Sequence, residues 1–332
     1  MKTILVTGAA GFIGSHLVEK LLQNKENRVR LVVAPFDSLK NLPFGTYEIC
    51  VADIRDKNSL KNIVKGVDVV YHLAALTMKR HYTEKDYFDT NAQGTENLLE
   101  VLKKERIKKF VFFSSIAVFG LPAYVGDMNN LGESAEKKAP EVYGQSKLKA
   151  EHILQEYHKK YKIPYTIIRP TTVYGPKDTQ NLAELYQVIN KGMFFLLGST
   201  RNMMDYVYVK DLVAGAILAA NTMPVATDYI LGGGKPHSLR EIGNGVAKSI
   251  HKSIPQFSIP LPIALAAAYV MSHTFKAFGK VSPIFPDRVR VMTRNCYFSI
   301  KKARKEIGYK PEYTLTNGLR ETADWLFANK IL

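Results

Sequence analysis

The chain has 332 residues, of which 46% are hydrophobic and 11% aromatic, enough for a buried core and too many for a mainly disordered protein. Its 46 Lys and Arg residues outnumber its 30 Asp and Glu residues and give a formal net charge of +16. These basic residues are spread along the chain and do not form one block interleaved with aromatic residues. Nucleic-acid binding is therefore not expected, whereas an anionic substrate, a phosphate or a membrane surface stays open as the partner.

The cysteines and the N-terminal residues indicate the cellular compartment in which the protein is expected. Cys50 and Cys296 are the only cysteines, and they are far apart and belong to no CxxC element, so neither a disulfide framework nor a metal site is expected. Residues 1–14 run into glycines and lack an apolar helix of signal-peptide length. We therefore expect a cytoplasmic protein.

The first half of the chain alternates short β-rich runs with amphipathic segments. The β-rich runs are 2–8, 28–34, 47–54, 67–75 and 108–115, and the amphipathic segments are 15–24, 60–66 and 95–105. Strands that are apolar almost throughout are typical of a parallel sheet covered on both faces. The pattern predicts an α/β protein with a doubly wound parallel sheet of the Rossmann type.

After Gly175 the pattern becomes less regular. We expect a helix at 182–191, a strand at 205–209, a helix at 212–220 and a strand at 228–231, the last three returning to the first domain. This predicts a dinucleotide-binding domain of residues 1–175 and 205–232. A smaller, discontinuous substrate domain would then consist of residues 176–204 and 233–332.

The longest uncharged stretch, residues 253–275, is long enough to span a bilayer, but three prolines and several polar residues interrupt it. We expect its segment 259–278 to be a core or domain-interface helix. The alternative is a substrate or membrane face, with Lys276 and Lys280 suited to lipid headgroups. Six residues could share one face of this helix: Ile263, Ala266, Ala267, Val270, Met271 and Phe278.

A glycine-rich turn follows the first predicted strand. Gly8, Gly11 and Gly14 in the run TGAAGFIG have the spacing GxxGxxG and stand between a strand and a helix. Glycine lets the backbone approach a pyrophosphate, whose charge is met by the N–H groups at the start of the helix. We predict a dinucleotide site here, which includes Phe12 and Ile13.

The residues after the next two predicted strands concern the adenosine half of the dinucleotide. Neither an acid nor an Arg stands directly at the end of the second strand, and Asp37 follows a few residues later. We expect NAD, with NADP left open. Asp53 and Ile54, at the end of the third strand, are placed for the adenine end, although the spacing fits Asp53 equally well as a helix N-cap or a turn acid before Asn58 and Leu60.

Three residues form a candidate catalytic group. Ser115 stands at the end of a predicted strand, where ligands bind in open α/β sheets. Tyr143 and Lys147 are four residues apart on a predicted helix and therefore share one face. An ammonium near a phenol lowers the pKa of the phenol, which would make Tyr143 a general acid or base. Each residue alone has an ordinary explanation, but the combination indicates catalysis.

Together, these motifs resemble the extended short-chain dehydrogenase/reductase family, also called the NAD-dependent epimerase/dehydratase family. The resemblance covers most of the chain and rests on TGAAGFIG, ADIRD, YHLAA, TNAQGTENL, SSIAVFG, YGQSK, RPTTVYGP and DYVYVKDL in that order. It implies that Ser115 and Tyr143 polarise a carbinol or carbonyl oxygen and that Lys147 also binds the nicotinamide ribose. It further implies cofactor contacts by Ala74, Ala75, Asn91, Pro170, Thr172 and Val173.

The residues around this group limit which of the family's reactions the protein can catalyse. Dehydratases of the family carry carboxylates directly after the site hydroxyl, whereas Ser115 is followed by Ile116 and Ala117, so sugar dehydration is not expected. Met204 stands where nucleotide-sugar members commonly carry an Arg, which weakens the match to UDP-galactose epimerases. By resemblance to enzymes of UDP-N-acetyl sugars, the substrate-binding candidates are Thr77, Asn181, Arg201 and Asn202.

We expect hydride transfer on an anionic nucleotide sugar, by C4 epimerisation or reduction of a 4-keto sugar, in a homodimer. One alternative is a dehydrogenase of the 3β-hydroxysteroid or dihydroflavonol type acting on an apolar alcohol, whose pattern shares the Asn before the strand at 205–209 and an apolar C-terminal domain. The other is a dinucleotide-binding sensor or scaffold without catalysis. The presence of both Tyr143 and Lys147 argues against the latter.

Overall fold

The computed structural model describes residues 2–332 except 78–81, 223–224, 279–281 and 283–284. Seven parallel strands form one sheet in the order β12-β7-β5-β4-β1-β2-β3. Their bounds are β1 (Lys2–Thr7), β2 (Asn27–Val33), β3 (Glu48–Val51), β4 (Val69–His72), β5 (Lys109–Phe113), β7 (Tyr165–Pro170) and β12 (Ala226–Leu231). The predicted doubly wound parallel sheet is confirmed.

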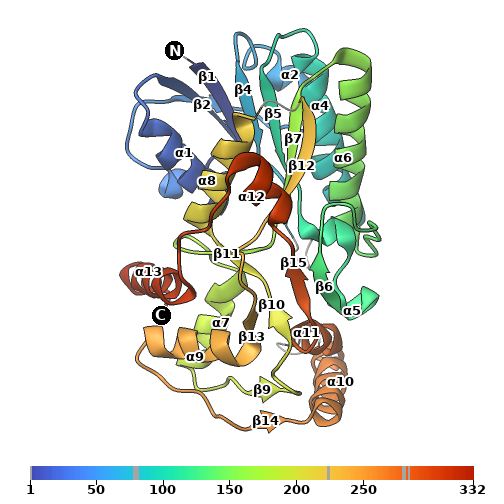
Figure 1. Ribbon diagram of the computed structural model, residues 1–332, viewed down its shortest axis with the longest axis vertical. Helices are drawn as coiled ribbons and strands as arrows, with labels where there is room; N and C mark the ends of the chain where they lie inside the picture. The colour runs from blue at the N-terminus through green and yellow to red at the C-terminus, as the bar shows by residue number, and fades with distance from the viewer. Residues whose placement is uncertain (1, 78–81, 223–224, 279–281, 283–284) are drawn as a thin grey trace.

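Helices cover both faces of this sheet (Figure 1). One face carries α1 (Phe12–Leu22), α8 (Val209–Ala220) and α12 (Lys301–Ile307), and the other carries α2 (Lys57–Leu60), α4 (Gly94–Leu102) and α6 (Val142–Tyr161). Successive side chains of β1 alternate between two buried clusters, with Ile4 and Val6 in the first and Leu5 in the second. Both faces therefore need apolar residues, which explains the uninterrupted apolar strands.

The order of the strands reverses at β1, because the chain first builds β2 and β3 on one side and then β4, β5, β7 and β12 on the other. A doubly wound sheet leaves a crevice at such a point, outside the carboxyl ends of its strands. Gly8 follows β1, and Ser114 and Ser115 follow β5, at this edge. The topology thus brings the glycine turn and the candidate serine to the same side of the sheet.

The smaller elements extend beyond the carboxyl ends of the large sheet (Figure 1). Three short sheets, of β13-β10-β15-β6, β11-β8 and β14-β9, lie there. The strands are β6 (Met128–Leu131), β8 (Thr172–Tyr174), β9 (Leu196–Leu197), β10 (Met203–Met204), β11 (Tyr206–Tyr208), β13 (His237–Ser238), β14 (Ser258–Ile259) and β15 (Cys296–Phe298). The helices are α3 (Glu84–Tyr87), α5 (Pro122–Val125), α7 (Asn181–Asn190), α9 (Leu239–Ser249), α10 (Leu261–Ala277), α11 (Pro286–Met292) and α13 (Leu315–Ala328).

The elements expected after Gly175 are present. The helix at 182–191 is α7, the strand at 205–209 is β11, the helix at 212–220 is α8 and the strand at 228–231 is β12. β12 pairs with β7 in the large sheet, and α8 packs against α1, whereas β11 pairs with β8 in a separate small sheet. The division of the chain into two domains stays a prediction.

The amphipathic segment 60–66 forms less helix than its pattern suggests. The carboxylate of Asp56 accepts a hydrogen bond from the N–H of Asn58 (2.9 Å) and caps a helix that ends at Leu60. The chain then continues in turns, in which the N–H of Ile63 donates to the carbonyl of Leu60 (3.1 Å). Leu60 and Val64 are both buried, so these turns still cover the sheet.

The expectation that segment 259–278 is a core or interface helix is wrong in its burial. α10 is a helix, but it packs mainly through Ala264 and Ala268, with Val289 of α11 in the same small cluster. The other side of α10 is exposed, including Ile263 (60%) and Val270 (67%). Among the described residues, no helix has the length and apolar character that crossing a membrane requires.

His72 is a packed core residue at the end of β4. Its side chain is fully buried, with Nδ1 2.6 Å from Oγ1 of Thr7 and Nε2 2.9 Å from Oγ1 of Thr95. Thr7 Oγ1 accepts from the N–H of Ala74 and Thr95 Oγ1 donates to the carbonyl of Asn91, so a neutral imidazole that accepts at Nδ1 and donates from Nε2 satisfies every group. Burial lowers the pKa of His72 to about 3.

We predict that this histidine makes the protein acid-sensitive. The unfolded chain binds a proton on His72 near pH 6.5 and the folded protein only near pH 3, so the free energy of unfolding falls as the pH drops through this window, by up to about 1.4 kcal/mol per pH unit. Urea unfolding at pH 7, 5.5 and 4.5 gives the free energy of unfolding at each pH. This free energy should depend less steeply on pH in His72→Gln than in the wild type. The exposed His152→Gln control should keep the wild-type slope. Equal slopes for both variants would contradict the assignment.

Candidate functional site

The three glycines of the turn between β1 and α1 have two different roles. Gly8 has φ +67°, and a Cβ there would lie 2.7 Å from the backbone nitrogen of Ala74. A Cβ at Gly14 would lie 2.1 Å from the carbonyl oxygen of Gly8. The packing of the turn itself therefore requires both glycines. Gly11 is exposed, has φ −72°, and a Cβ there would come within 3.2 Å of that same oxygen, which is tight without being prohibitive.

The start of α1 can bind an anion. Its first hydrogen bond runs from the N–H of Ser15 to the carbonyl of Gly11 (3.0 Å), so the N–H groups of Phe12 and Ile13 precede the helical ladder. The first turn contains no acidic residue. A pyrophosphate placed here would meet these N–H groups and the positive end of the helix, and a side chain at Gly11 would obstruct its approach.

The candidates for the adenine end lie after β2 and β3. One carboxylate oxygen of Asp37 accepts the N–H of Ala34 (2.8 Å) and closes the turn after β2. Both oxygens of Asp53 accept from the Arg55 guanidinium (3.0 Å each to Nε), and these hydrogen bonds lower the pKa of Asp53. Because Asp56 caps α2, Asp53 is not the helix cap, but its Oδ1 also accepts the backbone N–H of Arg55 (2.9 Å), so the alternative that Asp53 is a turn acid is confirmed.

Asn91 joins the loop after β4 to α6. It is 1% exposed, its Oδ1 accepts the N–H of Leu76 (2.7 Å), and its Nδ2 donates to the carbonyl of Leu76 (3.1 Å) and to Oγ of Ser146 (2.9 Å). The loop so held contains Ala74 and Ala75, next to the glycine turn. Asn91 therefore positions the backbone between the cofactor candidates and the catalytic candidates.

The structure brings Ser115 and Tyr143 into contact. Ser115 follows β5, and its Oγ accepts the N–H of Ala117 (3.1 Å). Burial raises the pKa of the Tyr143 phenol, while a hydrogen bond with the Ser115 side chain opposes this rise. The ring of Tyr143 lies 6.2 Å, between centres, from the ring of Tyr87. Ser115 and Tyr143 are both partly exposed as residues.

Lys147 lies one turn further along α6 and is 2% exposed. Its ammonium is 4.4 Å from the centre of the Phe112 ring, and burial lowers the pKa of Lys147 to about 7, with Glu151 opposing. The expected lowering of the Tyr143 pKa by Lys147 is not what the structure shows, since the group that lowers it is the Ser115 hydroxyl. The physical reason is that burial shifts Lys147 toward its neutral form, which weakens the stabilisation that an ammonium would give to a phenolate.

The sequence reasoning missed a buried ion pair behind this group. The guanidinium of Arg169 in β7 donates to both carboxylate oxygens of Glu151 in α6 (2.8 Å each) and to Asp228 in β12 (2.5 Å). The hydroxyl of Ser114 donates to the same Glu151 (2.6 Å). Two signals could have revealed the pair: an Arg inside the apolar strand YTIIRP, and a Glu four residues after Lys147.

Pro170, Thr172 and Val173 lie where the chain leaves the large sheet. Pro170 is the last residue of β7, and β8 begins at Thr172 and pairs in parallel with β11. β7 is the neighbour of β5, whose end carries Ser115. These three residues therefore start at the same edge of the sheet as the candidate catalytic group.

Two of the substrate candidates, Thr77 and Asn181, lie near each other at the start of α7. The hydroxyl of Thr77, after β4, donates to Oε1 of Gln180 (3.4 Å), and α7 begins at the next residue, Asn181. This contact places Thr77, from the loop after β4, beside the segment that follows β8.

The other two candidates, Arg201 and Asn202, lie together just before β10. They line a pocket of about 200 Å³ whose other residues are Asp127, Ser199, Thr293 and Asn295. The amide nitrogen of Asn202 donates to the carbonyl of Met292 (2.7 Å), while its Oδ1 is buried and has no hydrogen-bond partner among the described residues. Asn202 thus holds the end of α11, whereas the exposed Arg201 can reach a ligand.

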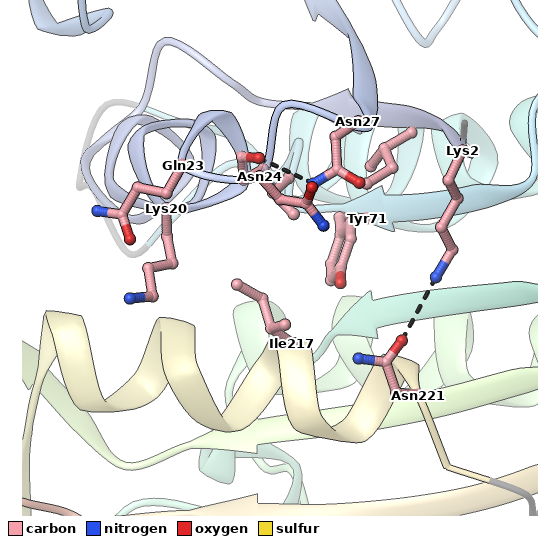
Figure 2. A pocket seen from close by; sticks show the side chains of 10 residues that line it. Lys2, Lys20, Gln23, Asn24, Asn27, Tyr71, Ile217 and Asn221 are labelled. Carbon is pink, nitrogen blue, oxygen red and sulfur yellow. Dashed lines mark hydrogen bonds between the residues drawn. The ribbon is translucent and has the colours of Figure 1, made fainter.

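A larger cavity, of about 370 Å³, lies elsewhere (Figure 2). Figure 2 shows Lys2, Lys20 and Tyr71 around it, and a hydrogen bond from Lys2 to Asn221 (3.3 Å) crosses one side. It adjoins Lys2, the first residue of β1, and Asn27, the first residue of β2. Ligands in open α/β sheets bind at the carboxyl ends of the strands, so this cavity is not the candidate site.

Comparison with known proteins agrees with this geometry. Residues 4–232 match the model of the NAD-dependent epimerase/dehydratase family. The chain is 30% identical to a putative UDP-glucose 4-epimerase of Methanocaldococcus jannaschii, over 98% of this chain and 99% of that protein. It is 28% identical to the N-acetyl-alpha-D-glucosaminyl-diphospho-ditrans,octacis-undecaprenol 4-epimerase of Escherichia coli O157:H7, over 98% and 96%. A similar solved structure is the UDP-glucuronic acid 4-epimerase of Bacillus cereus in complex with UDP-glucuronic acid and NAD, with a TM-score of 0.79, 26% identity and coverage of 98% and 99%.

Proposed function

This chain belongs to the NAD-dependent epimerase/dehydratase family, and we propose that it epimerises an anionic nucleotide sugar at C4 with NAD as its cofactor. The observation that carries the proposal is the arrangement at the carboxyl edge of the sheet, where Ser115 follows β5 and its side chain opposes the rise that burial causes in the pKa of Tyr143 on α6. The similarity to 4-epimerases of sugars linked to a diphosphate supports the substrate class. Reduction of a 4-keto sugar is the related reaction that the same site could perform.

The residues present fit the cofactor. The N–H groups of Phe12 and Ile13 and the open face of Gly11 suit its pyrophosphate. Asp37 and Asp53 are proposed for the adenosine end, where two carboxylates favour the hydroxyl of NAD over the phosphate of NADP. The remaining proposed contacts are Gly8, Gly14, Ile54, Ala74, Ala75, Asn91, Lys147, Pro170, Thr172 and Val173.

The proposed mechanism assigns proton transfer to Tyr143. Bound NAD supplies the acceptor and the donor of the hydride. The Ser115 hydroxyl opposes the rise that burial causes in the pKa of Tyr143 and so favours its deprotonated form. In that form the Tyr143 oxygen takes the proton of the 4-hydroxyl as C4 is oxidised, and the Ser115 hydroxyl holds the same substrate oxygen. After the keto sugar turns its other face, Tyr143 returns the proton as C4 is reduced. Proton and hydride are both returned, so the cycle has no net oxidation.

We also propose that the enzyme acts as a homodimer in the cytoplasm. Cys50 and Cys296 are both free thiols, as a reducing compartment would keep them. Light scattering coupled to size-exclusion chromatography measures the mass directly, and a mass near that of one 37.3 kDa chain would contradict the dimer.

We predict that Gly11→Val abolishes NAD binding and leaves the fold intact, because the new side chain occupies the approach to the pyrophosphate and its Cβ comes close only to the carbonyl oxygen of Gly8 (3.2 Å). Titration calorimetry with NAD measures the affinity, and thermal unfolding without NAD measures the stability. Gly14→Ala is the contrasting variant, and it should lower the melting temperature, since its Cβ clashes with backbone. Unchanged NAD affinity in Gly11→Val would show that the site is misplaced.

Tyr143→Phe should lose turnover by about 100-fold or more and keep its NAD affinity, because only the proton-transferring oxygen is removed. The matched control is Tyr157→Phe, which removes from the same helix a hydroxyl that donates to Glu100 (2.6 Å) and should keep turnover. Absorbance at 340 nm separates the reactions, since epimerisation recycles the cofactor and reduction consumes it. Near-normal turnover in Tyr143→Phe would refute the mechanism.

Arg201→Ala should weaken a UDP-sugar by about 1.5 to 3 kcal/mol, the range of a charge-assisted hydrogen bond. Arg288→Ala removes an Arg that is paired with Glu184 and is absent from the pocket lining, so it should bind the sugar normally. Inhibition by UDP gives the affinity in both variants. If UDP-sugars do not bind and a hydroxysteroid drives reduction of NAD, the enzyme is instead a dehydrogenase of apolar alcohols.

A further inference from the structure

α10 turns an uncharged apolar side toward solvent. Ile263, Ala266, Ala267 and Val270 are all exposed and recur at positions i, i+3, i+4 and i+7, so they form one stripe along the helix. We call these four residues the α10 stripe. The surface helices of globular proteins place charged or polar residues on this side. Residues 261–275 of α10 contain no Asp, Glu, Lys or Arg at all.

Other exposed apolar side chains adjoin the start of α10. Phe195 and Phe257 are 40% and 64% exposed, and their ring centres lie 6.2 Å apart. They precede β9 and β14, two strands that pair with each other, and α10 begins two residues after β14 ends at Ile259. Leu197 of β9 and Ile259 of β14 pack in the same small cluster as α10. The two phenylalanines and the α10 stripe thus belong to one end of the molecule, the end opposite the large sheet in Figure 1.

The charge of this end is positive. Residues 185–204 and 242–286, which build β9, β14 and α10, contain no Asp or Glu. Lys191, Lys252 and Lys276 in these segments are exposed, while Lys280 lies outside the described residues. The acids that border the two segments are occupied: Glu184 pairs with Arg288, Asp287 pairs with Arg290, Glu241 takes part in the cap of α9, and Asp205 is 3% exposed.

From these observations we propose that the α10 stripe, Phe195 and Phe257 form a surface that binds the face of an anionic lipid bilayer. Apolar side chains on a helix of this kind enter the boundary between headgroups and acyl chains, and the surrounding lysines attract anionic headgroups. Neither contribution alone gives stable binding, and this end of the molecule provides both. The proposal does not depend on the proposed epimerisation, because vesicle binding is measured without sugar or NAD.

The test is cosedimentation of the full-length protein with vesicles. The wild type should bind vesicles of phosphatidylcholine with 30% phosphatidylglycerol about tenfold more strongly than pure phosphatidylcholine vesicles at low salt, since each lysine near the surface adds attraction. Val270→Asp should reduce binding to the anionic vesicles about tenfold, because a carboxylate replaces an inserting side chain. Its melting temperature without vesicles should stay at the wild-type value, which excludes misfolding.

Val225→Asp is the matched control, because Val225 is exposed to a similar extent (61% against 67%) but adjoins the start of β12 in the large sheet. It should bind anionic vesicles like the wild type. Equal losses in both variants would mean that added negative charge alone weakens binding, and would overturn the proposal. A Val270→Asp protein that binds vesicles normally but changes its mass in light scattering would also overturn it and assign the stripe to contact between copies of this chain.

Discussion

The buried ion pair between Glu151 and Arg169 determines where the candidate catalytic group lies. Removing one partner of such a pair strands a charge in the interior, at a cost of about 3 to 5 kcal/mol, so the contact allows little variation in geometry. It fastens α6, which carries Tyr143 and Lys147, to β7, and the hydroxyl of Ser114 adds the end of β5. The catalytic candidates from two elements are therefore held in place by neighbouring residues that do not react.

A second polar connection joins the glycine turn to the same helix. It runs through one buried imidazole and a series of hydroxyl and amide groups, so its members are fixed by hydrogen bonds in addition to packing. In order they are Thr7, His72, Thr95, Asn91, Ser146 and the carbonyl of Tyr143. The proposed cofactor turn and the proposed acid/base residue consequently belong to one rigid unit. Under the proposed function, the less regular segments around Thr77 and Arg201 would determine which substrate binds.

The two ends of the molecule obey different constraints. At the carboxyl edge of the sheet, buried polar side chains such as Glu151 and Asn91 are fixed by hydrogen bonds, which suits a site that must hold its geometry. At the far end, α10 exposes apolar side chains that a soluble surface would not need. The proposed membrane surface accounts for that exposure, and the proposed chemistry does not.

The sequence by itself determined the features that arise from local patterns: the parallel sheet from apolar runs, the glycine turn from its place between strand and helix, and the shared face of Tyr143 and Lys147 from their spacing. Tertiary structure decided everything that depends on partners distant in the chain. Asn202 is held by a carbonyl 90 residues away, and Glu151 meets Arg169 from another element. It also decided burial, which lowers the pKa of Lys147 to about 7 and leaves Ile263 exposed. A periodic pattern shows which side of a helix is apolar, but only the packed neighbours determine whether that side is covered.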